Sequence, residues 1–107
     1  MTASPARRVG TIDELERAGD YCLGEIEHLG EVRPQLWFLL PLHEGATRFD
    51  RPTVGSGLHG ISSPPWTFRE CADGSIEVRA SILCKSGAEG PEGYFHGWLD
   101  EGNIWRY

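Results

Sequence analysis

The sequence lacks the features that mark several large classes of protein. Its longest apolar run covers residues 36–40, far short of the about 20 residues that a membrane-spanning helix requires. The N-terminal residues contain no apolar segment of the kind found in secretion signals. We therefore expect a cytoplasmic protein that does not associate with membranes.

Cysteine and clustered basic residues are also scarce. The three cysteines, Cys22, Cys71 and Cys84, are widely spaced and form no C-x-x-C pair, so we expect free thiols. Lys and Arg number 10 against 16 Asp and Glu, which gives a formal net charge of −6. Because nucleic-acid binding requires clustered cations that neutralise phosphates, this composition argues against a nucleic-acid partner.

What the sequence does contain is enough apolar material for one small domain. It has 107 residues, of which 39% are hydrophobic and four are tryptophan. We expect a disordered arm over residues 1–10 and a single β-rich domain over residues 11–107. The predicted fold is mainly β, or α+β at most, with a small antiparallel sheet in a barrel-like or sandwich arrangement. One short N-terminal helix is predicted, because Thr11 and Glu14 fit a capping box and Gly19 supplies a stop.

Hydrophobic patterning predicts the strands. Residues 21–27 alternate in part, and residues 35–42 form an apolar run, bounded by prolines, that is typical of a strand buried on both faces. Residues 43–65 are rich in Gly, Ser, Pro and charge, which predicts a long loop holding at most one short strand. Two hairpins, over residues 66–83 and 94–107, are predicted to organise the core. In the first, a turn at Asp73-Gly74 leads into a strand over residues 75–83, whose alternation places Ile76, Val78, Ala80 and Ile82 on one face.

A glycine motif in the predicted loop resembles a nucleotide-binding fingerprint. Residues 55–60 match G-x-G-x-x-G, which binds pyrophosphate only where it opens a helix. Pro64 and Pro65 follow too closely for a helix to begin there. We therefore interpret this stretch as a flexible glycine loop.

Histidines and cysteines are the candidate metal ligands. A zinc site needs three or four converging side chains, and no pair in this sequence has diagnostic spacing. We expect no metal and no cofactor, with the cysteines packing as small hydrophobic residues. The alternative is a zinc site that the fold would assemble from His43, His59, Cys84 and His96.

Ser81 and His96 are the candidate catalytic residues. Ser81 is predicted on the polar face of its strand, and His96 alternates with Tyr94 and Trp98 on the next predicted strand. The two side chains could meet if those strands pair. A nucleophilic serine needs a histidine within hydrogen-bond reach and a third group that orients the imidazole. Glu77 or Glu25 could serve as that third group. The alternative is that Ser81 and His96 are only polar neighbours.

Aromatic residues gather in the last third of the sequence. Most are expected in the core, but the C-terminal hairpin carries aromatic side chains on both faces. The sequence therefore predicts a binding patch that draws on Tyr94, Trp98, Trp105 and Tyr107.

Three short motifs stand out in residues 19–107: a tryptophan strand at 64–68, a serine strand at 81–84 and a histidine hairpin at 95–102. Together they resemble a loose family of small, uncharacterised phage and prophage proteins. A more distant resemblance is to the proposed peptidase of bacterial ubiquitin-like operons, a zinc-stabilised β domain with a Ser/His site. Residues 40–43 replace the cysteine cluster of that family, and Ala80 replaces its usual proline. Ser81 and His96 match, so the resemblance implies a catalytic role for them.

Three functions are compatible with these features. The first is a phage or prophage accessory protein that binds another protein, such as a bacterial host protein that it inhibits, without chemistry of its own. The second is a peptidase-like hydrolase that uses Ser81 and His96. The third is a structural phage component. The sequence does not determine the oligomeric state or the partner.

Overall fold

The computed structural model describes residues 2–41, 54–58, 65–84 and 95–107. These residues form strands and one 3₁₀ turn, η1. The elements are β1 (Ala3–Pro5), β2 (Arg7–Arg8), η1 (Ile12–Glu14), β3 (Asp20–His28), β4 (Glu31–Leu39), β5 (Val54–Leu58), β6 (Thr67–Glu70), β7 (Ile76–Arg79), β8 (Ile82–Cys84), β9 (Phe95–Asp100) and β10 (Ile104–Arg106). Within these ranges, no helix has the length and apolar character needed to cross a lipid bilayer.

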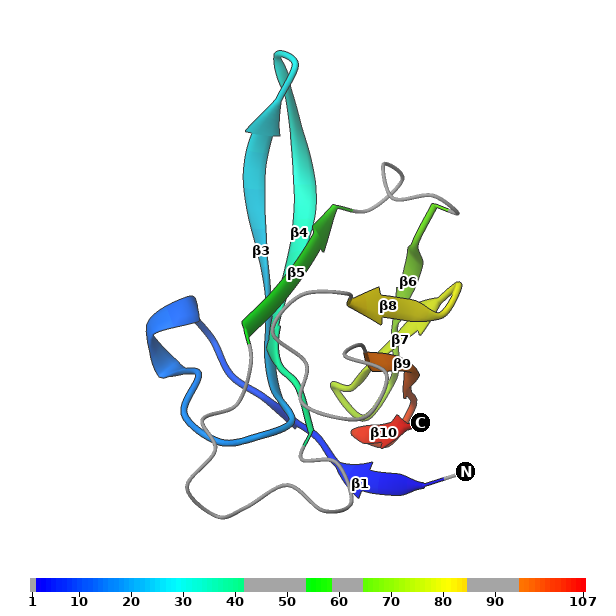
Figure 1. Ribbon diagram of the computed structural model, residues 1–107. Helices are drawn as coiled ribbons and strands as arrows, with labels where there is room; N and C mark the ends of the chain where they lie inside the picture. The colour runs from blue at the N-terminus through cyan, green and yellow to red at the C-terminus, as the bar shows by residue number, and fades with distance from the viewer. Residues whose placement is uncertain (1, 42–53, 59–64, 85–94) are drawn as a thin grey trace.

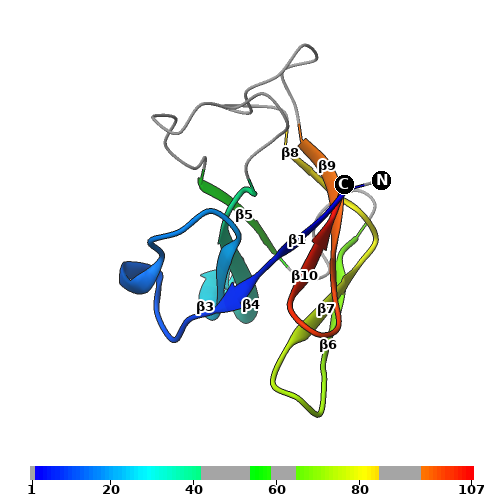
Figure 2. The ribbon, with the colours of Figure 1, turned by 90° about the horizontal axis from the view of Figure 1, so that it is seen from below.

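The strands form two four-stranded sheets and a two-stranded pair. One sheet has the order β1-β10-β9-β8, the second has the order β2-β3-β4-β5, and β6 pairs with β7. Figures 1 and 2 show β3 and β4 on one side of the molecule and β9 and β10 on the other. The prediction of a mainly β fold is therefore confirmed. The described strands do not close into a barrel.

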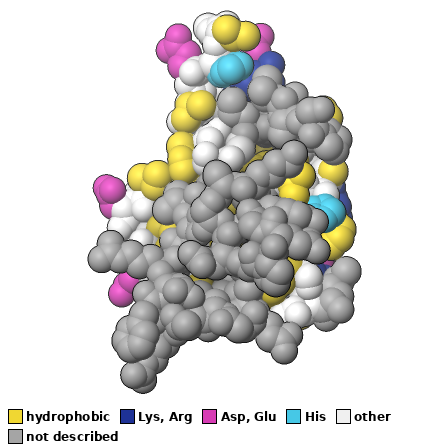
Figure 3. Space-filling model, in the orientation of Figure 1, with side chains coloured by type: hydrophobic (Ala, Val, Ile, Leu, Met, Phe, Trp, Pro, Cys, Tyr) yellow, Lys and Arg dark blue, Asp and Glu magenta, His cyan; other side chains and the backbone are white. Residues whose placement is uncertain are grey.

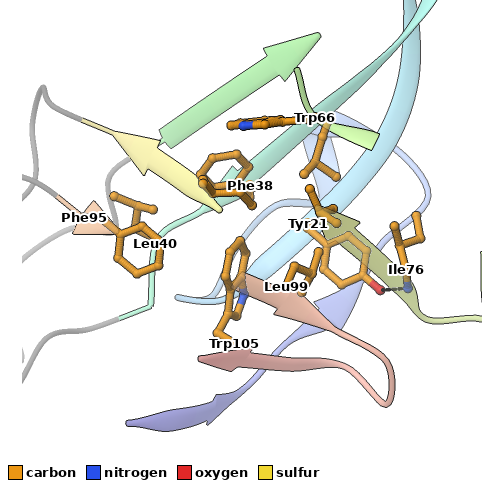
Figure 4. Packing of buried hydrophobic residues seen from close by; sticks show 11 residues of the cluster. Tyr21, Phe38, Leu40, Trp66, Ile76, Phe95, Leu99 and Trp105 are labelled. Atoms are coloured by element: carbon orange, nitrogen blue, oxygen red, sulfur yellow. Dashed lines mark hydrogen bonds between the residues drawn. The ribbon is translucent and has the colours of Figure 1, made fainter. Parts of the chain in front are cut away.

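The buried side chains between these strands form one hydrophobic core (Figure 4). Trp105 is fully buried, and its ring centroid lies 5.5 Å from that of Phe38 and 5.8 Å from that of Phe95. The Trp105 indole N–H donates to the carbonyl oxygen of Gly19 at 2.9 Å, so its one polar group is satisfied. The core thus contains residues from both sheets. Packing the sheets against each other removes these large apolar side chains from water, which stabilises the fold.

The first hairpin confirms the strand that was predicted over residues 21–27. β3 and β4 are joined by Leu29 and Gly30, whose φ angles of 51° and 82° fit a two-residue type I′ turn. Pro34, one of the prolines expected to bound the apolar run, instead lies inside β4 opposite Glu25. In this register the nitrogen of Pro34 points away from β3, so its missing N–H removes no bond between β3 and β4.

The glycine loop that was predicted over residues 55–60 is in part a strand. Gly55 and Gly57 lie in β5, which pairs antiparallel with β4. β5 is therefore the one short strand that was allowed for in the loop predicted over residues 43–65. Gly57 is required by close packing, because a Cβ atom there would lie 1.9 Å from Cζ3 of Trp66. Residues 59 and 60 of the motif lie outside the described residues.

The C-terminal third contains the two predicted hairpins, with one change. Residues 75–83 were expected to form one strand, but β7 ends at Arg79 and β8 begins at Ile82. The alternation still holds, since Ile76, Val78 and Ile82 are all buried. The bend between the strands lets β7 pair with β6 while β8 pairs with β9.

The N-terminal segment differs most from expectation. Instead of a disordered arm, its residues form β1, which pairs with β10, and β2, which pairs with β3. The predicted helix is also wrong, because only the 3₁₀ turn η1 forms and Thr11 makes no side-chain cap. One carboxylate oxygen of Asp20 accepts from the backbone N–H groups of Glu16 and Arg17, at 3.0 and 2.8 Å. These bonds hold the segment in a turn rather than a second helical turn.

Candidate functional site on the outer face of the β8-β9-β10 sheet

The candidate site lies on the solvent-facing side of the C-terminal sheet. Along β9, Phe95, Gly97 and Leu99 are buried, whereas His96 is exposed and Trp98 is half-buried. β8 pairs antiparallel with β9, and Leu83 lies opposite His96. Directly paired residues share a face of the sheet. We therefore define the outer face as Leu83, His96 and Trp98, with Ser81, which precedes β8, and Arg106, which lies opposite Trp98 on β10.

Ser81 and His96 meet, as the pairing of their strands predicted. The hydroxyl oxygen of Ser81 lies 2.8 Å from Nε2 of His96, which is a hydrogen bond. The imidazole ring of His96 also packs against Trp98, with ring centroids 5.4 Å apart and planes tilted by 35°. This arrangement allows the imidazole to accept a proton from the hydroxyl, and it leaves both groups open to a ligand.

The third group of a catalytic triad is not seen in the described part of the chain. Glu77 was one predicted partner for the imidazole, but its carboxylate faces Arg69 at 3.4 Å and Arg79 at 3.8 Å. Glu25, the other, lies on β3 in the opposite sheet (Figure 1). No hydrogen bond joins either carboxylate to His96 among the described residues. The observed unit is a Ser–His pair rather than a triad.

The sequence did not single out two arginines and a leucine beside this pair. Leu83 is 47% exposed, which is high for a large apolar side chain. Arg79 and Arg106 share one carboxylate, since Asp100 contacts the first at 2.6 Å and the second at 2.7 Å. The outer face therefore combines exposed apolar area at Leu83 with arginines that are ion-paired to Asp100.

The predicted aromatic patch is reduced to one member on this face. Trp105 was expected to bind a partner, but it is fully buried in the core. Tyr107 is half-buried and packs on Phe95, with ring centroids 5.5 Å apart. Tyr94 lies outside the described residues. Trp98 is therefore the aromatic side chain of the predicted patch that the structure places on the outer face.

The zinc alternative involves residues that lie largely outside the described part of the chain. The structure does not describe His43, His59 or the side chain of Cys84. His96 is described, and its imidazole is hydrogen-bonded to Ser81. Among the described residues, no group of three or more His, Cys, Asp or Glu side chains could hold a metal ion.

Two other thiols and one carboxylate have definite environments. Cys22 and Cys71 are free and buried, and burial raises the pKa of the Cys22 thiol, with Glu14 adding to the effect. Burial also tends to raise the pKa of Asp20. The bond to Arg7 and the N–H groups of Arg17 and Glu16 outweigh it and lower that pKa to about 2. None of these three side chains belongs to the outer face, so they do not contribute to the candidate site.

Comparison with family models, with curated proteins and with solved structures finds no match to this chain.

Proposed function

We propose that this protein is a small accessory domain that acts by binding another protein through the outer face. The exposed apolar side chain of Leu83, on the same face of the sheet as Trp98, is the observation that supports this proposal. Protein-binding surfaces are enriched in tryptophan and arginine, the residue types that contribute most to binding. Arg106 lies directly opposite Trp98, and Arg79 lies close by through Asp100. The resemblance to phage and prophage proteins supports a bacterial protein as the partner.

A capture experiment from bacterial lysate with matched variants tests this proposal. Trp98→Ala removes the anchor, and Arg106→Ala removes a cation at its side. Ile12→Ala is the control, since Ile12 is 48% exposed in η1, outside the β8-β9-β10 sheet. We expect the control to retain the partner and both outer-face variants to lose it. Equal recovery by all three proteins would contradict the proposal.

A second candidate function is hydrolysis of an ester or amide with Ser81 as the nucleophile. The 2.8 Å bond between Ser81 and His96 favours it, because a nucleophilic serine needs a base at that distance. In this mechanism Nε2 of His96 accepts the proton as the serine oxygen attacks the carbonyl carbon, and it returns the proton to the leaving group as the bond to the carbonyl carbon breaks. A water molecule, deprotonated by the same nitrogen, then releases the acyl group and restores the Ser81 hydroxyl.

Labelling with a fluorophosphonate tests the hydrolase without knowledge of its substrate. The serine oxygen would displace fluoride at phosphorus, and the mass of the peptide that contains residue 81 would report the adduct. We expect labelling of the native protein and none of Ser81→Ala or His96→Gln. Ser56→Ala, at an exposed position of β5, is the control and should label normally. Native protein that takes up no label would exclude this function and leave the binding proposal untouched.

A further inference from the structure

The β3–β4 hairpin extends beyond the strands that flank it. β2 pairs only with Asp20 and Tyr21, and β5 pairs only with residues 35–39 of β4. In the described part of the chain, residues 23–34 therefore form a two-stranded ribbon, which Figure 1 shows projecting from the other strands. Figure 3 shows acidic, basic, histidine and hydrophobic side chains together at its far end.

The register determines which backbone groups point away from the ribbon. His28 and Glu31 flank the two-residue turn and form a hydrogen-bonded pair, so bonding between the strands recurs at every second residue of β3. The N–H and C=O groups of Leu23, Glu25 and Glu27 consequently point outward, away from β4. Tyr21, two residues before Leu23, shows this direction, since its outward carbonyl accepts from Val9 N–H at 2.8 Å.

The two edges of the ribbon differ. The outer edge of β4 contains Pro34, which has no N–H to donate to an added strand. The outer edge of β3 contains no proline, and beyond Tyr21 its backbone has no partner among the described residues. An unpaired edge of this length is a template for another strand. Only the β3 edge is therefore open to strand addition.

The side chains along the β3 edge define the chemistry of an added strand. Glu25 and Glu27 are exposed on one face of the ribbon, and neither has an ion-pair partner among the described residues. On the other face, Ile26 is half-buried, and the Trp37 ring covers Gly24 so closely that a Cβ there would lie 2.6 Å from Cζ3. One face of the edge thus favours cations, and the other favours apolar side chains.

We infer that the β3 edge binds an extended segment of a partner protein in which Lys or Arg alternates with apolar residues. The segment would pair its backbone with Leu23, Glu25 and Glu27 and place its cations beside the two glutamates. A second copy of this chain fits poorly, since it would bring Glu25 and Glu27 of two molecules together. This site lies on the opposite sheet from the outer face, so the inference stands apart from the proposed function.

Binding of a short capped peptide in which lysine alternates with valine tests the inference. The readout is the change in backbone amide resonances when the peptide is added to the full chain. We expect the largest shifts and slowed amide exchange at Leu23, Glu25 and Glu27. A peptide in which glutamate replaces lysine should produce none of these changes. Shifts spread over acidic side chains throughout the molecule, or no shifts at all, would overturn the inference.

Two variants separate the backbone contribution from the charge contribution. Glu25→Pro removes an outward N–H, as Pro34 does on the opposite edge, and should lower the affinity for the lysine peptide at least tenfold. The double variant Glu25→Gln and Glu27→Gln keeps the backbone donors and should also weaken binding at least tenfold. If Glu25→Pro does not fold, the glutamine variant decides the outcome. Unchanged affinity in a folded variant contradicts the part of the inference that the variant tests.

Discussion

The two hairpins β3–β4 and β9–β10 have similar local structure and different surroundings. Each joins antiparallel strands through a tight turn with positive φ angles, at Leu29 and Gly30 in one and at Gly102 and Asn103 in the other. The β9–β10 hairpin has β8 on one side and β1 on the other, and its Leu99 and Trp105 are fully buried in the core that the two sheets share. Among the described residues, the β3–β4 hairpin is flanked by other strands at its base alone. Neighbouring strands, rather than the hairpin pattern, decide how much of each hairpin is buried.

Removing the largest side chain of the embedded hairpin should have the largest effect. Trp105→Ala should lower the free energy of unfolding by about 3–5 kcal/mol, because it leaves a cavity and removes the bond to Gly19. Trp98→Ala, on the half-buried face of the same hairpin, should cost less than about 1.5 kcal/mol. Urea denaturation measures both. Equal losses would mean that the two faces of the hairpin are buried alike.

A smaller effect is expected where the base of the β3–β4 hairpin meets β5. Gly57→Ala would place a methyl group 1.9 Å from Cζ3 of the buried Trp66, so the ring must move. We expect a loss of up to about 3 kcal/mol in urea denaturation, in the range for overpacked cores. Gly10→Ala is the matched control, since its nearest atom would be a glutamate oxygen at 3.4 Å. A control that loses as much as Gly57→Ala would refute the packing argument.

An ion pair between Arg7 and Asp20 joins the N-terminal segment to the base of β3. This ion pair predicts that the stability of the protein depends on pH. Arg7 contacts both carboxylate oxygens of Asp20, at 3.0 and 2.6 Å, and the folded-state pKa of Asp20 is about 2. Since the pKa is lowered on folding, the stabilisation is present above pH 4 and is lost as the pH falls from about 4 to 2. It amounts to about 2 kcal/mol. Asp20→Asn should flatten the stability profile over that pH range, and an unchanged slope would contradict the assignment.

The smallest effect should come from the turn at the far end of the ribbon. Leu29 is 91% exposed and has a φ of 51°, a conformation that leucine rarely adopts. Leu29→Asn would supply the Asn-Gly pair that type I′ turns favour and should stabilise the protein by up to about 1 kcal/mol. Leu29→Ala removes the same apolar group without the turn preference. If alanine stabilises the protein as much as asparagine does, backbone conformation is not the cause.

Local patterns in the sequence predicted the hairpins well. The Asp73-Gly74 turn and the alternation of Ile76 and Val78 identified the β6–β7 hairpin, because hairpin pairing depends on residues close in sequence. The strands β1 and β2 were not predictable in this way. Each is too short to show a pattern, and its partner lies elsewhere in the chain. The predicted helix failed because the capping pattern cannot reveal the competing bonds to Asp20.

The candidate site was predictable only in part. Ser81 and His96 could be placed together from the expected pairing of their strands, and their contact follows that expectation. Trp105 was assigned to a surface because alternation along a strand does not say which face is covered. Arg106 and Leu83 join the outer face through the register of β8, β9 and β10. Register across three strands is a tertiary property that no single segment encodes.

The N-terminal segment carries a consequence for the order in which the molecule assembles. β1 joins one sheet and β2 joins the other, with only Ala6 between them, so a few residues fasten the two sheets to each other. The pairing of Ala3 with Arg106 spans nearly the whole chain, and contacts of such long range close slowly. We expect the hairpins to form first and this segment to close last. Its pairing would then be the last step of folding, in which the backbone of one short segment joins the two sheets.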